Sequence, residues 1–505
     1  MKKPVSLAFL MILGFWLNAD AQSLSEAQRI THLLNRIGYG PRPGDVDRVR
    51  QTGISKYIDQ QLHPELIDDN VTNIRLEPFS SLQMSIAEIF EHFQDPLQLA
   101  QQLGITSDNA ASRQQVQATM QEKGIYLPQR LAQELAGQKL VRAVSSERQL
   151  QEVMTDFWYN HFNIFFGKGL DRYLTTDFEM NAIRPHTLGK FKDLLMATAK
   201  SPAMMFYLDN VLSTSPDPRA AAVLAQRGGN NQQKPGINEN YARELMELHT
   251  MGVDGGYTQK DVQEVARAFT GWSIAQVQDT ESMAQMQRQA SRLGLGSQPG
   301  QRGDFMFRPF MHDTGEKTVL GHTIKAGGGI DDGEQVIDIL SRHPSTARVI
   351  STKLVQRFVS DMPPQALVDR VSATYMKTDG DIREMLGVIL TSNEFSSAES
   401  YQAKIKSPLE LVVSSIRALS GRTDGSPQLV QTIDRMGQPL YRFEAPTGFP
   451  DRASYWMTNG VLVERINFGI ALTSSRIPGT KVDLKEFKDP QAAALYLGSP
   501  EFQKK

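Results

Sequence analysis

The segment Asn238–Trp272 has an unusual density of Asn, Glu, Arg and His. Glu244 and His249 are its candidate catalytic residues, because a Glu within reach of a His can act as acid or base near neutral pH. The side chains of this segment that we expect to bind substrate are Asn238, Asn240, Arg243 and Trp272. The alternative is a capped helical hairpin whose charges form surface ion pairs.

Two further histidines stand in polar surroundings. His161 follows Trp158 by three residues, a spacing that places it on the apolar face of a helix. It is either a hydrogen-bonded core histidine, or a general base or metal or haem ligand. His312 precedes Asp313 and is a fourth candidate catalytic residue, although such a stretch is more often a solvent-exposed turn.

The loop Ala445–Trp456 contains two prolines and a glycine, which impose a rigid shape. Asp451 and Trp456 lie in this loop, and Arg465 lies on the helix that follows it. Aromatic, acidic and Arg side chains on a rigid loop suit a carbohydrate or peptide surface, so these three residues are substrate-binding candidates. The alternative is that Trp456 fills the core. No pattern identifies a cofactor or a metal.

The elements that position these residues are helical. Tyr241, Leu245 and Leu248 form an apolar stripe in the first helix of the hairpin, and Thr258 with Asp261 predicts the cap of the second. Strand patterns are scarce, and Lys317–Ile324 is the best candidate for a short ribbon. We therefore predict a mostly α fold: a large multi-helix domain with long loops and at most a short β-ribbon.

Composition excludes several classes of protein. The chain has 505 residues, no cysteine and a net charge of −2. The absence of cysteine rules out disulfides and thiolate metal sites, so the fold depends on core burial. Because the net charge is small and charges of both signs are interspersed along the chain, we expect no nucleic-acid partner.

The N-terminus predicts export. Met1-Lys2-Lys3 is followed by an apolar run from Val5 to Leu17 and by Ala19-Asp20-Ala21, as in a secretory signal peptide cleaved after Ala21. The mature protein is then periplasmic or extracellular. No later stretch approaches the length of a membrane span, so we expect none in the mature chain.

Composition shifts divide the chain into five regions. We predict a signal peptide (1–21), an N-terminal helical region (22–145) and a central helical core that contains the hairpin (146–275). A flexible loop (276–305) and a C-terminal helical region (306–505) follow. The loop Ser213–Gly236, rich in Ser, Pro, Gly and Asn, leads into the hairpin, and long loops beside a site often cover it.

Seven motifs occur in a fixed order: His32–Gly40, Phe157–Phe162, Asn238–Trp272, His312–Lys317, Lys406–Glu410, Pro446–Asp451 and Ser499–Gln503. Together they resemble the bacterial family called domain of unknown function 1800, over nearly all of the mature chain. The resemblance implies an exported protein, and a partnership with a sulfatase-like protein of the domain of unknown function 1501 type, whose gene often lies beside that of a family member. Many relatives have a second His where this chain has Tyr159, which weakens a metal site built on His161.

Three hypotheses follow from these patterns. The first is an envelope or extracellular enzyme, hydrolase-like, that acts on glycan or peptide, with the motifs converging on one polar cleft. The second is a non-catalytic binding or accessory protein that works with the sulfatase-like partner. The third is a metal- or haem-binding helical protein that uses His161.

Overall fold

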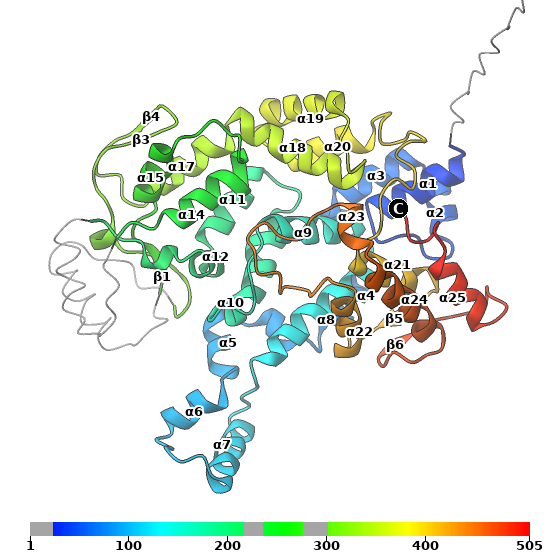
Figure 1. Ribbon diagram of the computed structural model, residues 1–505, viewed down its shortest axis with the longest axis horizontal. Helices are drawn as coiled ribbons and strands as arrows, with labels where there is room; N and C mark the ends of the chain where they lie inside the picture. Colours follow the sequence, from blue (N-terminus) through cyan, green and yellow to red (C-terminus); the bar gives the residue numbers. More distant parts are fainter. Residues whose placement is uncertain (1–23, 217–235, 276–300) are drawn as a thin grey trace, which may run out of the picture.

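The computed structural model describes residues 24–216, 236–275 and 301–505. The predicted signal peptide and most of the two predicted loops, Ser213–Gly236 and 276–305, lie outside these residues. The described part is mostly helical, which confirms the predicted fold class (Figure 1). None of its helices combines the length and the apolar character needed to cross a membrane.

The helices of the first half of the chain are α1 Glu26–Arg36, α2 Asp45–Thr52, α3 Ile54–Leu62, α4 Asn70–Leu76, α5 Ile86–His92, α6 Pro96–Gln102, α7 Ala110–Glu122, α8 Gln129–Ser145, α9 Gln149–His161, α10 Asp171–Asp177, α11 Phe191–Lys200 and α12 Pro202–Tyr207. Those of the second half are α14 Glu239–Glu244, α15 Gln259–Ala268, α17 Asp331–Ser341, α18 Pro344–Phe358, α19 Gln365–Thr378, α20 Ile382–Leu390, α21 Pro408–Ala418, α22 Pro427–Arg435, α23 Ala453–Trp456, α24 Asn459–Thr473 and α25 Pro490–Gly498. Two π-helical stretches, η3 Phe178–Ile183 and η6 Leu245–Met251, directly continue α10 and α14. The short 3-10 turns are η1 Pro64–Leu66, η2 Ser80–Gln83, η4 Arg184–His186, η5 Asn210–Leu212 and η7 Pro309–Met311.

Three antiparallel strand pairs complete the described elements. They are β1 Trp272–Ile274 with β2 Phe305–Phe307, β3 Lys317–Val319 with β4 His322–Ile324, and β5 Arg422–Thr423 with β6 Thr480–Lys481. The predicted ribbon is therefore β3–β4. The other two pairs join segments far apart in the sequence, and for that reason local hairpin signals could not predict them.

Helix boundaries follow side-chain caps. The Thr258 hydroxyl accepts from the backbone N–H of Asp261, whose carboxylate accepts from the Thr258 backbone, as predicted for the start of α15. Ser25 and Ser407 begin α1 and α21 in the same way. These caps fix where each helix begins and so which residues face the core.

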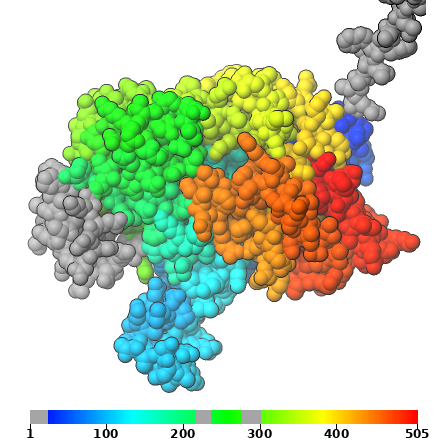
Figure 2. Space-filling model, in the orientation of Figure 1, coloured from blue at the N-terminus to red at the C-terminus, as the bar shows by residue number. Residues whose placement is uncertain are grey.

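The core is shared by both ends of the chain. One large cluster of buried apolar side chains includes Ile30 near the N-terminus and Phe502 near the C-terminus. Helix α9 lies in the middle of the molecule, and the segment 443–456 passes in front of it (Figure 1). Trp158 of α9 is fully buried, and its indole N–H donates to the Thr187 carbonyl. Helices α6 and α7 project from the body (Figure 2).

A buried charge cluster joins α18, α21 and the C-terminal segment. The carboxylate of Glu410 forms ion pairs with Arg357 and Lys505 and also caps α21 at Ser407. Burial by itself would raise the pKa of Glu410, but the two cations hold it well below its ordinary value. Because a charge inside a protein must be compensated, this one carboxylate fixes three elements relative to one another.

We predict that Glu410→Gln destabilises the protein strongly. Glutamine keeps the shape and the cap acceptor, but Arg357 and Lys505 would be left without their counter-charge, at a cost of about 3–5 kcal/mol. Urea denaturation measures the loss in free energy of unfolding. The matched control is Glu394→Gln, which removes a surface pair with Arg370 and should cost less than about 1 kcal/mol. Equal losses in the two variants would contradict the assigned role of Glu410.

Candidate functional site

The 443–456 segment is held against the end of α9 by two asparagines. The Asn160 amide donates to the carbonyl of Phe449 (2.9 Å) and accepts from its backbone N–H (2.7 Å). The Asn163 amide donates to the carbonyls of Phe443 and Ala445 (2.9 and 2.8 Å). These hydrogen bonds satisfy the backbone of the segment, as a strand partner would, and so fix its position.

Gly448 makes this close approach possible. Its φ of +67° lies in the left-handed region, and a Cβ at this position would come within 2.1 Å of the Asn160 carbonyl oxygen. Only glycine meets both requirements. The rigid shape predicted for the loop Ala445–Trp456 therefore depends on α9 as well as on its prolines.

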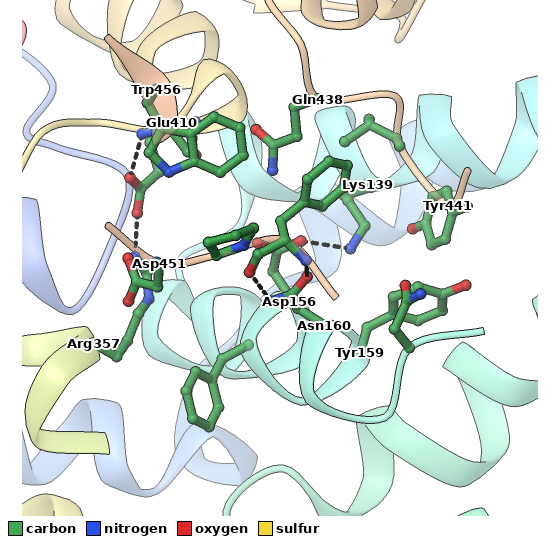
Figure 3. Close-up of a pocket in the computed structure, with 16 residues that line it drawn as sticks. Lys139, Asp156, Tyr159, Asn160, Arg357, Glu410, Gln438, Tyr441, Asp451 and Trp456 are labelled. Atoms are coloured by element: carbon green, nitrogen blue, oxygen red, sulfur yellow. Dashed lines mark hydrogen bonds and ion pairs between the residues drawn. The ribbon is translucent and has the colours of Figure 1, made fainter. Parts of the chain in front are cut away.

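A polar pocket lies beneath the clamped segment, with a cavity volume of about 80 Å³. It opens between α8, α9, α18, α21 and the segment (Figure 3). Aromatic rings and charged or amide side chains line it: Lys139, Asp156, Phe157, Tyr159, Asn160, Asn163, Arg357, Ser407, Glu410, Gln438, Leu440, Tyr441, Phe449, Pro450, Asp451 and Trp456.

Each side of this pocket has paired charges. On one side, Lys139 lies 2.9 Å from a carboxylate oxygen of Asp156 and 3.4 Å from Glu179. Burial alone would lower the pKa of Lys139, but these two carboxylates raise it, so the ammonium stays charged. On the other side are the Arg357–Glu410 pair and Asp451, which pairs with Lys404 (Figure 3). Such a pocket can bind a polar ligand, whereas its paired groups are poorly suited to proton transfer.

A wider cleft lies along the same segment, nearer its start. Its volume is about 530 Å³, and its lining is Phe165, Lys168, Tyr207, Leu208, Asp209, Asn240, Glu244, Glu444 and Pro446. The pocket and the cleft take neighbouring residues from the same two stretches, 157–168 and 443–456. The two cavities therefore lie along one clamped segment.

Glu244 is the acidic residue of the cleft best suited to proton transfer. Its side chain is half-buried, and it makes no hydrogen bond or ion pair with any residue in the described ranges. Burial, and then the nearby Glu247, raise the pKa of this carboxyl above its ordinary value. A carboxyl group that keeps its proton to higher pH can act as a general acid.

Two more carboxylates share the cleft with Glu244. The pKa of Tyr207 is raised by burial and also by the charges of Glu244 and Glu444, so both acids act on this one phenol. The Tyr207 hydroxyl donates to the backbone carbonyl of Glu444. Across the cleft, Asp209 pairs with Lys168 at 2.8 Å. A carboxyl with a raised pKa thus lines the same cleft as carboxylates in other surroundings, and such a difference can divide acid and base roles.

The predicted histidines His161 and His249 do come together, but outside the cleft. The imidazole of His161 contacts the His249 carbonyl through Nε2 (3.1 Å) and Lys353 Nζ through Nδ1 (2.9 Å). Burial, and then Lys353, hold the pKa of His161 well below its ordinary value, and burial lowers that of His249 to about 3. Both rings are therefore neutral at physiological pH.

This arrangement argues against His161 as a metal or haem ligand, because both its ring nitrogens already have protein partners. Within residues 24–216, 236–275 and 301–505, no group of three or more His, Asp or Glu side chains is placed to hold a metal ion. The preferred interpretation of His161 as a hydrogen-bonded core histidine is the one that its surroundings support.

His312 belongs to a third, separate cluster. Its Nδ1 contacts the Thr270 carbonyl and its Nε2 contacts Asp332 (3.2 Å), which pairs with Lys317 at 2.6 Å. All of these side chains are buried. The expectation of a solvent-exposed turn at His312 is therefore wrong: Asp332, from the glycine-rich stretch that follows, contacts both the imidazole and the Lys317 side chain in the interior.

One comparison with known proteins found a match. The family model described as "Protein of unknown function (DUF1800)" matches residues 32–504. The chain belongs to this family. No curated protein and no solved structure matches it. In this DUF1800 protein, the motifs do not converge on one cleft. The motifs that contain Asn160, Glu410 and Asp451 meet at the pocket, and the hairpin lines the cleft. The His312 motif contributes no residue to the lining of either cavity.

The predicted substrate-binding residues are divided among these places. Asn240 lines the cleft, and Asp451 and Trp456 line the pocket, although Trp456 is also largely buried as the alternative proposed. The other four contribute to structure: Asn238 caps α14, Arg243 pairs with Glu239, Trp272 packs fully buried against Gly333, and Arg465 is buried against Gln503 and the Lys406 carbonyl.

Several residues of the site were not predicted from the sequence. Lys139, Asp156, Asp209, Glu444 and Lys353 lie outside the motif-rich segments or at their edges. The nearest signal was the Asn-His-Phe-Asn run of α9, whose two asparagines mark the place where the segment binds. Nothing local indicates which distant acids this contact brings together.

We predict that Gly448→Ala disrupts the clamp. The new methyl group would overlap Asn160, so the segment must move and both cavities change shape. Thermal denaturation and limited proteolysis within 443–456 should show a less stable protein and faster cleavage. Gly437→Ala is the matched control, because Gly437 also has a positive φ (+92°) but a Cβ there would meet nothing within 4 Å. If both variants lose the same stability, backbone strain alone explains the effect.

Protein stability should also fall as the pH is lowered from 6.5 to 5. His32 and His249 have pKa values of about 3 in the folded protein because of burial. Near pH 6.5 the unfolded chain begins to bind protons that the folded protein does not accept, so each such histidine removes about 1.4 kcal/mol per pH unit below that value. Urea denaturation at several pH values measures this slope. His249→Gln should make it shallower, and an unchanged slope would contradict the neutral, buried state of His249.

Proposed function

We propose that this DUF1800 protein is an exported hydrolase that cleaves glycosidic bonds in the cleft beside the 443–456 segment. Glu244 is the general acid in this proposal, and Asp209 or Glu444 is the catalytic base or nucleophile. The single observation that supports it best is the half-buried Glu244 carboxyl, with its raised pKa and no protein partner among the described residues, facing an open cleft.

The chemistry requires two carboxyl groups with different proton affinities. One donates a proton to the oxygen of the leaving sugar, and the other activates water or attacks the anomeric carbon. Glu244 is suited to the first task because its pKa is raised. Asp209 is held beside the Lys168 ammonium and Glu444 is exposed, which suits either of them to the second task.

The remaining lining suits a polyhydroxylated substrate. Phe165 offers aromatic surface to the apolar face of a sugar ring, and the Asn240 amide can both donate and accept hydrogen bonds. The neighbouring pocket, with Asp156, Gln438 and Trp456, would bind an adjacent part of the same chain. Export by the predicted signal peptide of residues 1–21 would bring the protein to envelope or extracellular glycans.

One surface favours the accessory role as a second candidate function. Apolar side chains on the outer face of α24 and just before it are exposed: Tyr455, Met457, Leu462, Val463, Ile466 and Ile470. An exposed apolar face of this kind marks many protein-binding sites. In this alternative the protein docks to a partner, such as the sulfatase-like protein that the family resemblance implies, and the cleft only binds glycan.

We predict that Glu244→Gln abolishes cleavage and preserves binding. Purified protein would be incubated with defined oligosaccharides (chitopentaose, cellopentaose, xylopentaose and maltopentaose), and products would be identified by mass spectrometry. The cleavage rate should fall at least 100-fold, because general acid catalysis typically contributes 10²–10⁴-fold. The control is Glu239→Gln on the same helix, whose carboxylate already binds Gln259 and Arg243.

The pH profile tests the same assignment. Glu244 donates only when protonated, so the wild-type rate should decline as the pH rises through a pKa above 4.5. This alkaline decline should be absent from any residual activity of Glu244→Gln. Wild-type protein that binds an oligosaccharide without cleaving it, or a Glu244→Gln variant that cleaves normally, would favour the accessory role instead.

A further inference from the structure

Lys353 has an unusual environment for a lysine. It projects from α18 toward the end of α9 and the π-helix η6, where its Nζ contacts Nδ1 of His161 at 2.9 Å. It forms no ion pair with a carboxylate in the described part of the chain. By contrast, the buried Lys139 and Lys317 each form at least one such pair. The imidazoles of His161 and His249 face it from the packed elements, and neither supplies a negative charge that would offset its burial.

The contacts of His161 determine which way the amine points. Nε2 of His161 lies 3.1 Å from the His249 carbonyl, which can only accept, so Nε2 carries the ring hydrogen. Nδ1 is therefore the acceptor, and Lys353 donates one N–H to it. The remaining valences of Nζ make no contact with protein in residues 24–216, 236–275 and 301–505.

Burial disfavours the charged form of this amine. The pKa of Lys353 is lowered to about 8 by loss of solvation, with no carboxylate to offset it. At pH 7 roughly a tenth of such an amine is neutral, against less than a thousandth of an ordinary lysine. Neutral, desolvated lysines are the ones that attack carbonyl carbons in proteins.

The side chain that carries this amine is not fully enclosed. Lys353 is only partly buried. Figure 2 shows a hollow between the green hairpin region, the yellow region that contains α18 and the orange 443–456 segment, and its floor has the blue-green colour of α9. Gln356, one turn further along α18, donates to the Asp451 carbonyl, which places this face of α18 beside the clamped segment.

We propose that Lys353 is a nucleophilic amine that forms an imine with a small aldehyde or ketone entering this hollow. The neutral Nζ attacks the carbonyl carbon and forms a C–N bond. The carbonyl oxygen takes up one proton from the nitrogen and one from solvent and leaves as water, so that the imine forms in its protonated state. The product is a C=N bond to Lys353, and water reverses the reaction. This reactivity is independent of the hydrolysis proposed for the cleft.

Competitive labelling of the full mature chain tests the proposal. The folded protein is treated at pH 7 with limiting glycolaldehyde and sodium cyanoborohydride, which reduces each imine to a stable secondary amine. Peptide mass spectrometry then gives the labelling rate of every lysine. Lys353 should be labelled at least tenfold faster than Lys325 and Lys377, two exposed lysines without ion pairs within the described residues. Its rate should rise with pH to a midpoint near 8.

Two controls separate reactivity from mere exposure. Lys353→Arg keeps a cation and a donor to His161 and should remove only that labelled peptide. Protein unfolded in urea should label Lys353 no faster than Lys325, because the low pKa depends on the fold. Labelling of Lys353 in the folded protein at or below the rate of Lys325 would overturn the proposal. So would labelling that appears only after unfolding, since the amine would then be inaccessible.

Discussion

The pair of hydrogen bonds between the Asn160 amide and the backbone of Phe449 is the contact on which both cavities depend. The 443–456 segment contributes walls to the pocket and to the cleft, and the clamp fixes the middle of this segment against α9. Two features make the clamp possible: an asparagine at the end of a helix, and a glycine whose missing side chain lets two backbones approach. Backbone hydrogen bonds thus fix the geometry of the site together with the packing of Phe449 against Phe443 and Trp456.

Buried ion pairs also fix the arrangement of the helices. Glu179, Glu410 and Asp332 each lie in the interior with one or more cations against them. Such pairs contribute little net stability compared with apolar packing, but they strongly penalise any arrangement in which a partner is missing. In a chain without disulfides, they help to select one arrangement of many similar helices. Lys353 departs from this pattern because it is a partly buried amine that pairs with no acid among the described residues.

Much of the fold could be predicted from the sequence, and less of the site. Helical periodicity and caps such as Thr258–Asp261 are local, so they identified the elements and the β3–β4 ribbon. The hairpin's Glu244 and Asn240 were found because they lie in a polar segment. Asp209, Glu444 and Lys353 could not be identified from the sequence, because contacts between distant segments place them in these regions. Burial explains why Trp272, Arg465 and His312 resemble site residues: each is a polar or aromatic group that the core itself requires.

The π-helix η6 sets the relation between two of the polar regions. Glu244 ends α14 and faces the cleft, whereas His249 lies five residues later within η6 and faces Lys353. A π-helix closes its hydrogen bonds from residue i to i+5 and so has a wider turn than an α-helix. Loss of a single residue between Glu244 and His249 would therefore replace this wide turn by an α-helical one and change the spacing between the two side chains. We expect substitutions in this part of the hairpin to be tolerated more readily than insertions or deletions.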